Sequence, residues 1–202
     1  MDFESCMAWA EKADAVELRL DLCPPFSPDQ MRELTWSGCQ WIATCRPGAM
    51  PDEARYACLS QAMICGATFI DVEKNAEKAY REALMHTARQ FSCNVIISHH
   101  DTEGTPDDKT LQRIIREAFA LGADYVKLVT AVQTPDDTVR LLRLYEQFDQ
   151  LIAFGMGPES RDSRVRAAAD SVFTYVAPDS AHRTAPGQLI WEEALALDLD
   201  KE

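Results

Sequence analysis

The sequence has little positive charge, and no stretch of it is rich in lysine or arginine. Its 202 residues include 20 basic and 33 acidic side chains, which gives a formal net charge of −13. Nucleic acids and anionic membranes attract proteins through clustered cations, so this composition argues against both as partners. The composition still allows an anionic small molecule as a ligand, provided that the few cations converge on one site.

Long apolar runs are absent too, because nothing approaches the roughly 20 apolar residues of a membrane-spanning helix. The first residues, MDFESCMAWAEK, carry acidic side chains early and only a short apolar stretch, so we expect no signal peptide. The seven cysteines are scattered and form no CxxC pair, which is typical of reduced thiols rather than of a disulfide framework. The sequence therefore predicts a cytoplasmic protein.

Recognisable metal-binding patterns are also missing. The chain has four histidines and no HExxH motif. Two of the histidines, His99 and His100, are adjacent, and adjacent residues on a strand point to opposite faces. We therefore expect no metal site.

What the sequence does contain is a repeated alternation of strand and helix. Short runs rich in β-branched and apolar residues recur, and most are separated by segments with helical periodicity, such as 111–121. The expected strands are 17–22, 41–46, 69–73, 95–100, 125–130, 151–156 and 172–177. Such alternation predicts parallel βα units, and the length suits a single domain, residues 1–202.

Both a doubly wound open sheet and a (β/α) barrel fit this alternation, and the polar residues decide between them. Several lie at or near the ends of expected strands: Glu17, Arg19, Arg46, Glu73, His100 and Lys127. Strands of an open parallel sheet are apolar on both faces, whereas a barrel gathers strand ends around one axis and holds its active site there. We therefore predict an α/β protein with a (β/α)8 TIM-type barrel. Because the chain begins with a helical segment, the barrel is expected to lack or replace its first strand.

Lys127 stands between Val126 and Leu128 in an apolar strand, although lysine is rarely buried without a partner. An amine in a low-dielectric pocket loses its proton more readily, and a neutral amine attacks carbonyl groups to form a Schiff base. The alternative is a structural ion pair with Glu17 or Glu73 inside the barrel. The strand by itself does not decide between the two.

His100 shares a strand face with Ser98 and could act as a general acid or base if that face is interior. A structural histidine is the alternative, and from the strand alone it is the more frequent case. The loop in 154–165 carries glycines followed by Arg161 and Arg164, which suits an anion. Its alternative is a solvated arginine face.

The segment 183–189 has the pattern of a helix entry, with Thr184 as the cap and Pro186 in the first turn. The alternative is that it forms only a turn. In a functional role, Thr184 and Gln188 would supply hydroxyl and amide donors near the Arg164 loop.

Seven short signatures occur in one order: ELRLD, ATCRP, FIDVE, IISHHD, GADYVKL, GMG…SR and APGQ. In this order and spacing the chain resembles the type I 3-dehydroquinate dehydratases, from about Ala13 to Leu189. The resemblance implies a (β/α)8 barrel, usually dimeric, that acts as a hydro-lyase in the third step of the shikimate pathway. It implies no metal or organic cofactor.

The same resemblance implies roles for individual residues. Lys127 matches the Schiff-base lysine, and His100 matches the general acid and base. Arg164 is similar to a clamp for the substrate carboxylate. The other matched substrate-binding positions are Glu17, Arg19, Arg46, Thr184 and Gln188. The ring hydroxyls would fall to Arg46 with Glu17.

The chain also departs from the family pattern. Its TxRP motif should continue to a glutamate and two glycines, but this sequence has Met50, Pro51 and Asp52 there. In the family that glutamate helps to orient the catalytic histidine. Two alternatives therefore stay open: a class I Schiff-base aldolase whose glycine loop holds a sugar phosphate, and a non-catalytic relative that binds shikimate-type ligands.

Overall fold

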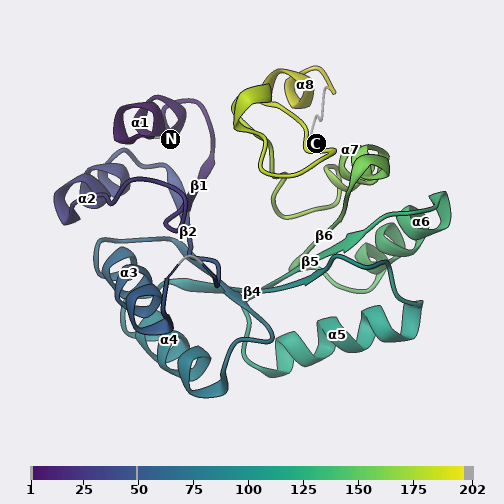
Figure 1. Cartoon of the computed structure of the whole chain (residues 1–202), viewed down its shortest axis with the longest axis horizontal. Coiled ribbons are helices and arrows are strands. Elements are labelled where there is room, and N and C mark those ends of the chain that lie inside the picture. Colours follow the sequence, from purple (N-terminus) through teal and green to yellow (C-terminus); the bar gives the residue numbers. More distant parts are fainter. Residues whose placement is uncertain (1, 49, 198–202) are drawn as a thin grey trace. The chain divides into compact units, whose positions relative to one another are not determined.

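The computed structural model describes residues 2–48 and 50–197. The chain divides into two compact units, with the boundary between Ile97 and Ser98. Each unit has strands and helices of its own (Figure 1). That residues 1–202 act as one domain stays a prediction. Among the described residues, no helix is long and apolar enough to cross a membrane.

In the first unit, strands and helices alternate after a starting helix. Its helices are α1 (Phe3–Ala10), α2 (Pro28–Trp36), α3 (Asp52–Ile64) and α4 (Lys78–Gln90), and its strands are β1 (Ala15–Arg19), β2 (Gln40–Thr44) and β3 (Phe69–Glu73). β1 pairs with β2 and β2 pairs with β3, both in parallel. The chain thus opens on a helix, as its first residues predict.

Local sequence explains how these elements begin and what they bury. Ser27 caps α2 through a capping box with Gln30, and Pro28 occupies the first helical turn, where its missing N–H is not needed. On the core side, Leu34 of α2, Trp41 of β2 and Leu59 of α3 are almost fully buried. Burial of such large side chains is the main source of stability for the unit.

In the second unit the alternation continues. Its strands are β4 (Asn94–Asp101), which runs across the boundary, β5 (Tyr125–Ala131) and β6 (Leu151–Met156), and its helices are α5 (Asp108–Ala120), α6 (Pro135–Arg143), α7 (Arg161–Ala167) and α8 (Trp191–Leu195). Single turns of 3₁₀ helix lie at Leu144–Glu146, Pro158–Ser160 and Ser180–His182. β4, β5 and β6 are neighbours in that order, and β5 and β6 pair in parallel from Val126–Leu151 to Ala131–Met156. The predicted apolar stripe of α5 is buried at Leu111, Ile114, Ile115 and Ala118.

The predicted strand 172–177 is wrong. Only Ala177 takes part in a β-bridge, an isolated parallel one with Ile190. The hydroxyl of Ser171 donates to the carbonyl of Phe173 at 2.8 Å, and the rings of Phe173 and Tyr175 pack on Tyr125 and Phe154. Aromatic packing therefore fixes this segment, and a strand ladder does not.

Candidate active site

Lys127 lies in the middle of β5 and is buried, with 3% of its surface exposed. Its ammonium nitrogen lies 4.0 Å from the centroid of the Tyr175 ring. A cation at this distance from a ring face is attracted by the ring quadrupole. The interior position that the apolar strand predicts is therefore the position that the structure gives, and the irregular segment after α7 supplies an aromatic neighbour.

Arg164, on α7, is almost as deeply buried as Lys127, with 7% of its surface exposed. Its guanidinium carbon lies 4.4 Å from the centroid of the Phe154 ring. Within the described part of the chain, Arg164 has no carboxylate partner, and its Nε has no hydrogen-bond acceptor. Burial without a countercharge lowers the pKa of Arg164 to about 10. A buried cation in this state is a ready receptor for an anionic ligand.

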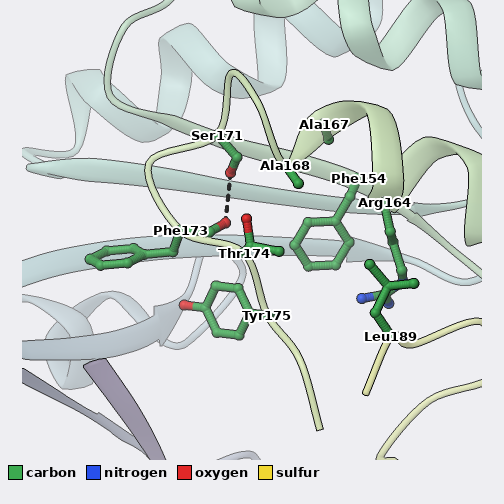
Figure 2. A pocket seen from close by; sticks show the side chains of 9 residues that line it. All are labelled: Phe154, Arg164, Ala167, Ala168, Ser171, Phe173, Thr174, Tyr175 and Leu189. Carbon is green, nitrogen blue, oxygen red and sulfur yellow. Dashed lines mark hydrogen bonds between the residues drawn. The ribbon is translucent and has the colours of Figure 1, made fainter. Parts of the chain in front are cut away.

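Arg164 lines a pocket in the second unit together with the two rings, Phe154 and Tyr175, whereas Lys127 is not among its lining residues. The wall of the pocket is formed by Phe154, Arg164, Ala167, Ala168, Ser171, Phe173, Thr174, Tyr175 and Leu189. Figure 2 shows the Phe154 ring with Tyr175 on one side and Arg164 on the other. The pocket therefore joins an apolar, aromatic wall to one strong cation, and its volume of about 10 Å³ is that of roughly one water molecule.

The sequence pattern singles out neither Phe154 nor Tyr175 as site residues. Both lie in runs that it assigns to strands, where aromatic residues are ordinary core. The only sequence signal for these two residues was strand alternation, which separates the side chains of one face from those that face away.

His100 lies near the carboxyl end of β4, the neighbour of β5 in the strand order. It is half-buried, while Ser98, two residues earlier on the same side of the strand, is fully buried. The face that His100 shares with Ser98 is thus fully buried at Ser98 and partly exposed at the strand end. This position suits a residue that must exchange protons with a bound molecule.

Two loops of the second unit pack closely on each other. A Cβ atom at Gly187 would lie 2.3 Å from the Ser160 hydroxyl and 2.7 Å from the Gly157 carbonyl oxygen, so only glycine fits there. Gly187 also has a φ of 77°, which favours glycine. This contact holds the segment 183–189 against the loop that leads to Arg164, where the sequence interpretation places it.

Thr184 and Gln188 meet within that segment, but they do not begin a helix. The backbone N–H and the hydroxyl of Thr184 both donate to Oε1 of Gln188, at 2.8 and 3.2 Å. The next helix, α8, begins only at Trp191. The helix entry is therefore wrong and the alternative, a turn, is right, because the positive φ of Gly187 does not continue a helix.

Arg161 is not part of the buried cation site. Its guanidinium is exposed and pairs with Glu193 at 3.1 Å, and Arg183 pairs with the same carboxylate. Of the two arginines in the glycine loop, only Arg164 points into the pocket.

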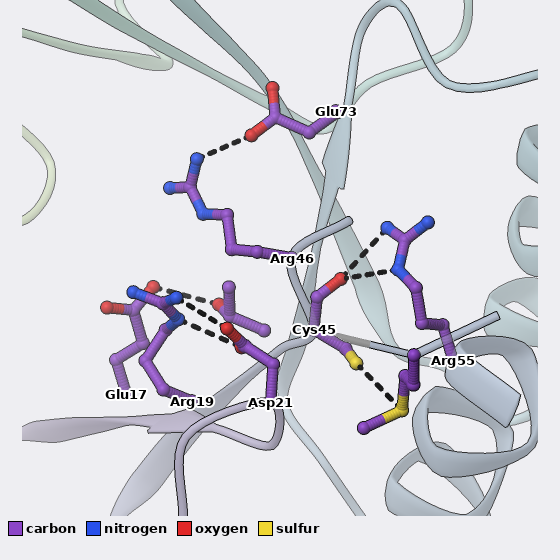
Figure 3. Close-up of polar contacts among 9 residues, drawn as sticks. Glu17, Arg19, Asp21, Cys45, Arg46, Arg55 and Glu73 are labelled. Carbon is purple, nitrogen blue, oxygen red and sulfur yellow. Dashed lines mark hydrogen bonds and ion pairs between the residues drawn. The ribbon is translucent and has the colours of Figure 1, made fainter. Parts of the chain in front are cut away.

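In the first unit, charged residues gather where β1 and β2 end (Figure 3). Glu17 accepts a hydrogen bond from the Thr44 hydroxyl at 2.8 Å. Arg19 binds the Asp21 carboxylate with two donors, at 3.0 and 2.6 Å. Glu17 and Arg19 also attract each other electrostatically, so the paired charges of this segment do lie together.

Arg46 follows β2 and pairs with Glu73 at the end of β3, with 2.5 Å between Nη1 and Oε1. Its backbone N–H donates to the Asp21 carboxylate. Burial alone would raise the pKa of Asp21, but the hydrogen bonds from Arg19 and from this N–H lower it overall. Asp21 therefore stays an anion that links Arg19 to the turn carrying Arg46.

Met50, which stands where the family motif has a glutamate, contacts a thiol. Its Sδ lies 3.8 Å from the Sγ of Cys45. A thioether cannot accept a proton or orient an imidazole by charge. Among the described residues, no group of three or more His, Cys, Asp or Glu side chains could hold a metal ion.

A family comparison identifies the chain. The model for type I 3-dehydroquinase matches residues 3–198. The chain belongs to the type I 3-dehydroquinase family. A 3-dehydroquinate dehydratase of Thermococcus gammatolerans is 36% identical over 184 residues, which cover 90% of this chain and 84% of that protein.

Solved structures of the family share the fold of this dehydroquinase. The 3-dehydroquinate dehydratase of Aquifex aeolicus has a TM-score of 0.81 at 25% identity, covering 98% of this chain and 94% of its own. The type I enzyme of Clostridium difficile also reaches 0.81, at 21% identity, covering 97% and 87%. These neighbours are TIM barrels, so the α/β barrel class predicted from the sequence is confirmed.

Proposed function

We propose that this type I 3-dehydroquinase dehydrates 3-dehydroquinate to 3-dehydroshikimate through a Schiff base on Lys127. The observation that carries the proposal is the burial of Lys127, in a chain whose relatives are 3-dehydroquinate dehydratases. Removal from water disfavours the ammonium form of a lysine and favours the nucleophilic amine. A buried lysine that forms an imine would activate a ketone without a cofactor.

The reaction needs an electron sink, since a ketone alone stabilises a neighbouring carbanion poorly. The Nζ of Lys127 adds to the carbonyl carbon, and loss of water leaves a protonated imine. Removal of the α-proton sends its electron pair into the imine, and the pair returns to expel the β-hydroxyl as water. Hydrolysis of the imine then releases the enone and restores the amine.

His100 supplies the proton transfers in this scheme. It would assist imine formation, take the α-proton, and give a proton to the departing hydroxyl. General acid and base help of this kind is typically worth about 10²–10⁴ in rate. The partial exposure of His100 at the end of β4 supports this role, because it leaves the imidazole accessible to a ligand.

Arg164 would bind the ring carboxylate. Its burial without a countercharge supports this assignment, because an incoming carboxylate supplies the missing anion and the acceptor for Nε. The remaining roles rest on the sequence motifs. Arg46 and Glu17 would hold ring hydroxyls beside Arg19. The Thr184 and Gln188 loop would cover the bound ligand. A cytoplasmic location and a homodimer also stay predictions.

The aldolase alternative is less well supported. Its phosphate site would use Arg161 together with Arg164, but Arg161 is exposed and pairs with Glu193. A single buried guanidinium balances the one charge of a carboxylate but leaves one charge of a phosphate dianion uncompensated. The non-catalytic alternative keeps one observation in its favour, which is the thioether of Met50 in place of a carboxylate.

The test is reductive trapping. Borohydride added with 3-dehydroquinate should attach the reduced substrate to the peptide that contains Lys127, as mass spectrometry would detect. Lys127→Ala should abolish both trapping and turnover, whereas Lys109→Ala, which changes an exposed lysine on α5, should leave both intact. An enzyme that forms enone at the normal rate without labelling would contradict the imine. Binding of 3-dehydroquinate without enone formation would support the non-catalytic relative.

A further inference from the structure

Arg55, on the first turns of α3, is a buried cation outside the set of residues assigned so far. Only 4% of its surface is exposed. Nη1 donates to the Asp52 carboxylate at 2.6 Å, and the guanidinium carbon lies 4.9 Å from the centroid of the Tyr80 ring. A neighbouring anion and a ring face therefore hold the guanidinium plane in one orientation.

The other donors of Arg55 converge on one backbone atom. Nε and Nη2 both donate to the carbonyl oxygen of Cys45, at 3.1 and 2.9 Å (Figure 3). Cys45 lies one residue past the end of β2, where the strand ladder has stopped. A two-pronged grip on a carbonyl fixes both the position and the tilt of its peptide plane.

That peptide plane is the one that leads into Arg46. Its carbonyl belongs to Cys45 and its N–H belongs to Arg46, and the N–H donates to the Asp21 carboxylate. The same peptide is thus held from one side by Arg55 and from the other by Asp21. Asp21 in turn is held by Arg19. The side chain that leaves this peptide ends at Glu73, 2.5 Å away.

We propose that Arg55 is a positioning residue for the reaction: with Asp21, it fixes the Cys45–Arg46 peptide and thereby the direction in which Arg46 presents its guanidinium. The inference rests on the proposed role of Arg46 in holding substrate hydroxyls. Arg55 itself touches no substrate. Lysine cannot replace it, since one ammonium cannot grip a carbonyl with two coplanar donors while it also binds Asp52 and stacks on Tyr80.

Steady-state kinetics on 3-dehydroquinate provide the test, with Arg55→Met and Arg55→Lys against Arg32→Met. Arg32 pairs with Asp29 three residues earlier, as Arg55 pairs with Asp52, but 42% of its side-chain surface on α2 is exposed, and it therefore serves as the matched control. Rates are normalised to the fraction of lysine that borohydride can trap. Arg55→Met should raise KM about 10-fold, Arg55→Lys about 3-fold, and Arg32→Met less than 2-fold. If KM is unchanged in both Arg55 variants, the proposal is overturned.

A double-variant cycle separates positioning from a general loss of stability. If Arg55 acts through Arg46, Arg46→Met should raise KM by itself, and adding Arg55→Lys should raise it less than 1.5-fold further. A full additional increase in that background would overturn the proposal. Ligand-induced thermal stabilisation by 3-dehydroquinate, measured in the Lys127→Ala background, gives the same comparison without turnover. A wild-type chain that binds but does not react would therefore contradict the proposed function alone, and one that does not bind would overturn both.

Discussion

The ammonium nitrogen of Lys127 lies over the face of Tyr175, 4.0 Å from the ring centroid. The two residues come from a regular strand and from an irregular segment that follows α7 about 50 residues later in the chain. The ring shields one side of the amine from water and restricts where the nitrogen can point. A nucleophile that is held in this way loses less freedom when it attacks a carbonyl.

The ring face of Tyr175, and not its hydroxyl, should matter for activity. Tyr175→Phe keeps the ring and should change kcat/KM by less than about 3-fold. Tyr175→Leu removes the ring face that would stabilise the cationic imine on Lys127, an effect worth about 0.5–2 kcal/mol, and should lower kcat/KM by about 3- to 30-fold. Steady-state kinetics and the rate of borohydride trapping check this. Equal losses in both variants would show that the hydroxyl is what counts.

Arg164→Met should separate activity from stability in opposite directions. Loss of the buried guanidinium should raise KM for 3-dehydroquinate at least 30-fold, because one partner of a buried charge pair is worth about 2–5 kcal/mol. The unliganded variant should melt at the same temperature as the wild type or higher, since an uncompensated buried cation is costly. Kinetics and thermal melts together check this. A clear drop in melting temperature would mean that Arg164 has a structural partner.

Gly155→Ala should destabilise the second unit by overpacking. A Cβ atom at Gly155 would lie 2.4 Å from Cγ2 of Val132 and 2.6 Å from the Ser163 hydroxyl, which accepts the hydrogen bond of the Gly155 N–H at 2.9 Å. Overpacking of this kind costs about 1–3 kcal/mol, or about 3–10 °C in melting temperature for a chain of this size. Gly104→Ala, where nothing lies within 4 Å, is the control. Equal melting temperatures for the two variants would refute the argument.

Asp137, at the start of α6, should make the stability of the protein depend on acid pH. Burial by itself would raise the pKa of Asp137, but N–H donors from Gln133 and Thr134 and the charge of Arg140 lower it overall. A carboxyl whose folded pKa lies below its unfolded value of about 4 stabilises the fold above that pH. This contribution disappears as the pH falls through the folded pKa.

Urea unfolding of Asp137→Asn checks this effect. The variant should be less stable than the wild type by about 1–2 kcal/mol at pH 7, and the difference should shrink steadily below pH 4. Asp136→Asn, which changes the exposed neighbour in the same helical turn, should show no such convergence. A difference that stays constant down to pH 2.5 would contradict the assignment.

The sequence by itself determined the alternation of strands and helices, because apolar period and helix-start residues are local properties of the chain. It also predicted the interior position of Lys127, since a charged residue inside an unbroken apolar strand has nowhere else to point. Polar residues near the strand ends favoured the barrel over an open sheet, and the seven family signatures in order implied the same fold. The seventh strand failed on the same local rule, since a β-branched and aromatic run forms a strand only where a neighbouring edge accepts its N–H groups.

Only the tertiary structure decided which partners the charged residues have. Arg161 and Arg164 are three residues apart and look equivalent in the sequence, but one pairs with Glu193 and the other is buried without a carboxylate. Arg55 looks like any helical arginine until the packing of α3 brings its guanidinium onto the carbonyl of Cys45. The physical reason is that burial and pairing depend on distances between segments far apart in the chain, and local periodicity carries no information about those distances.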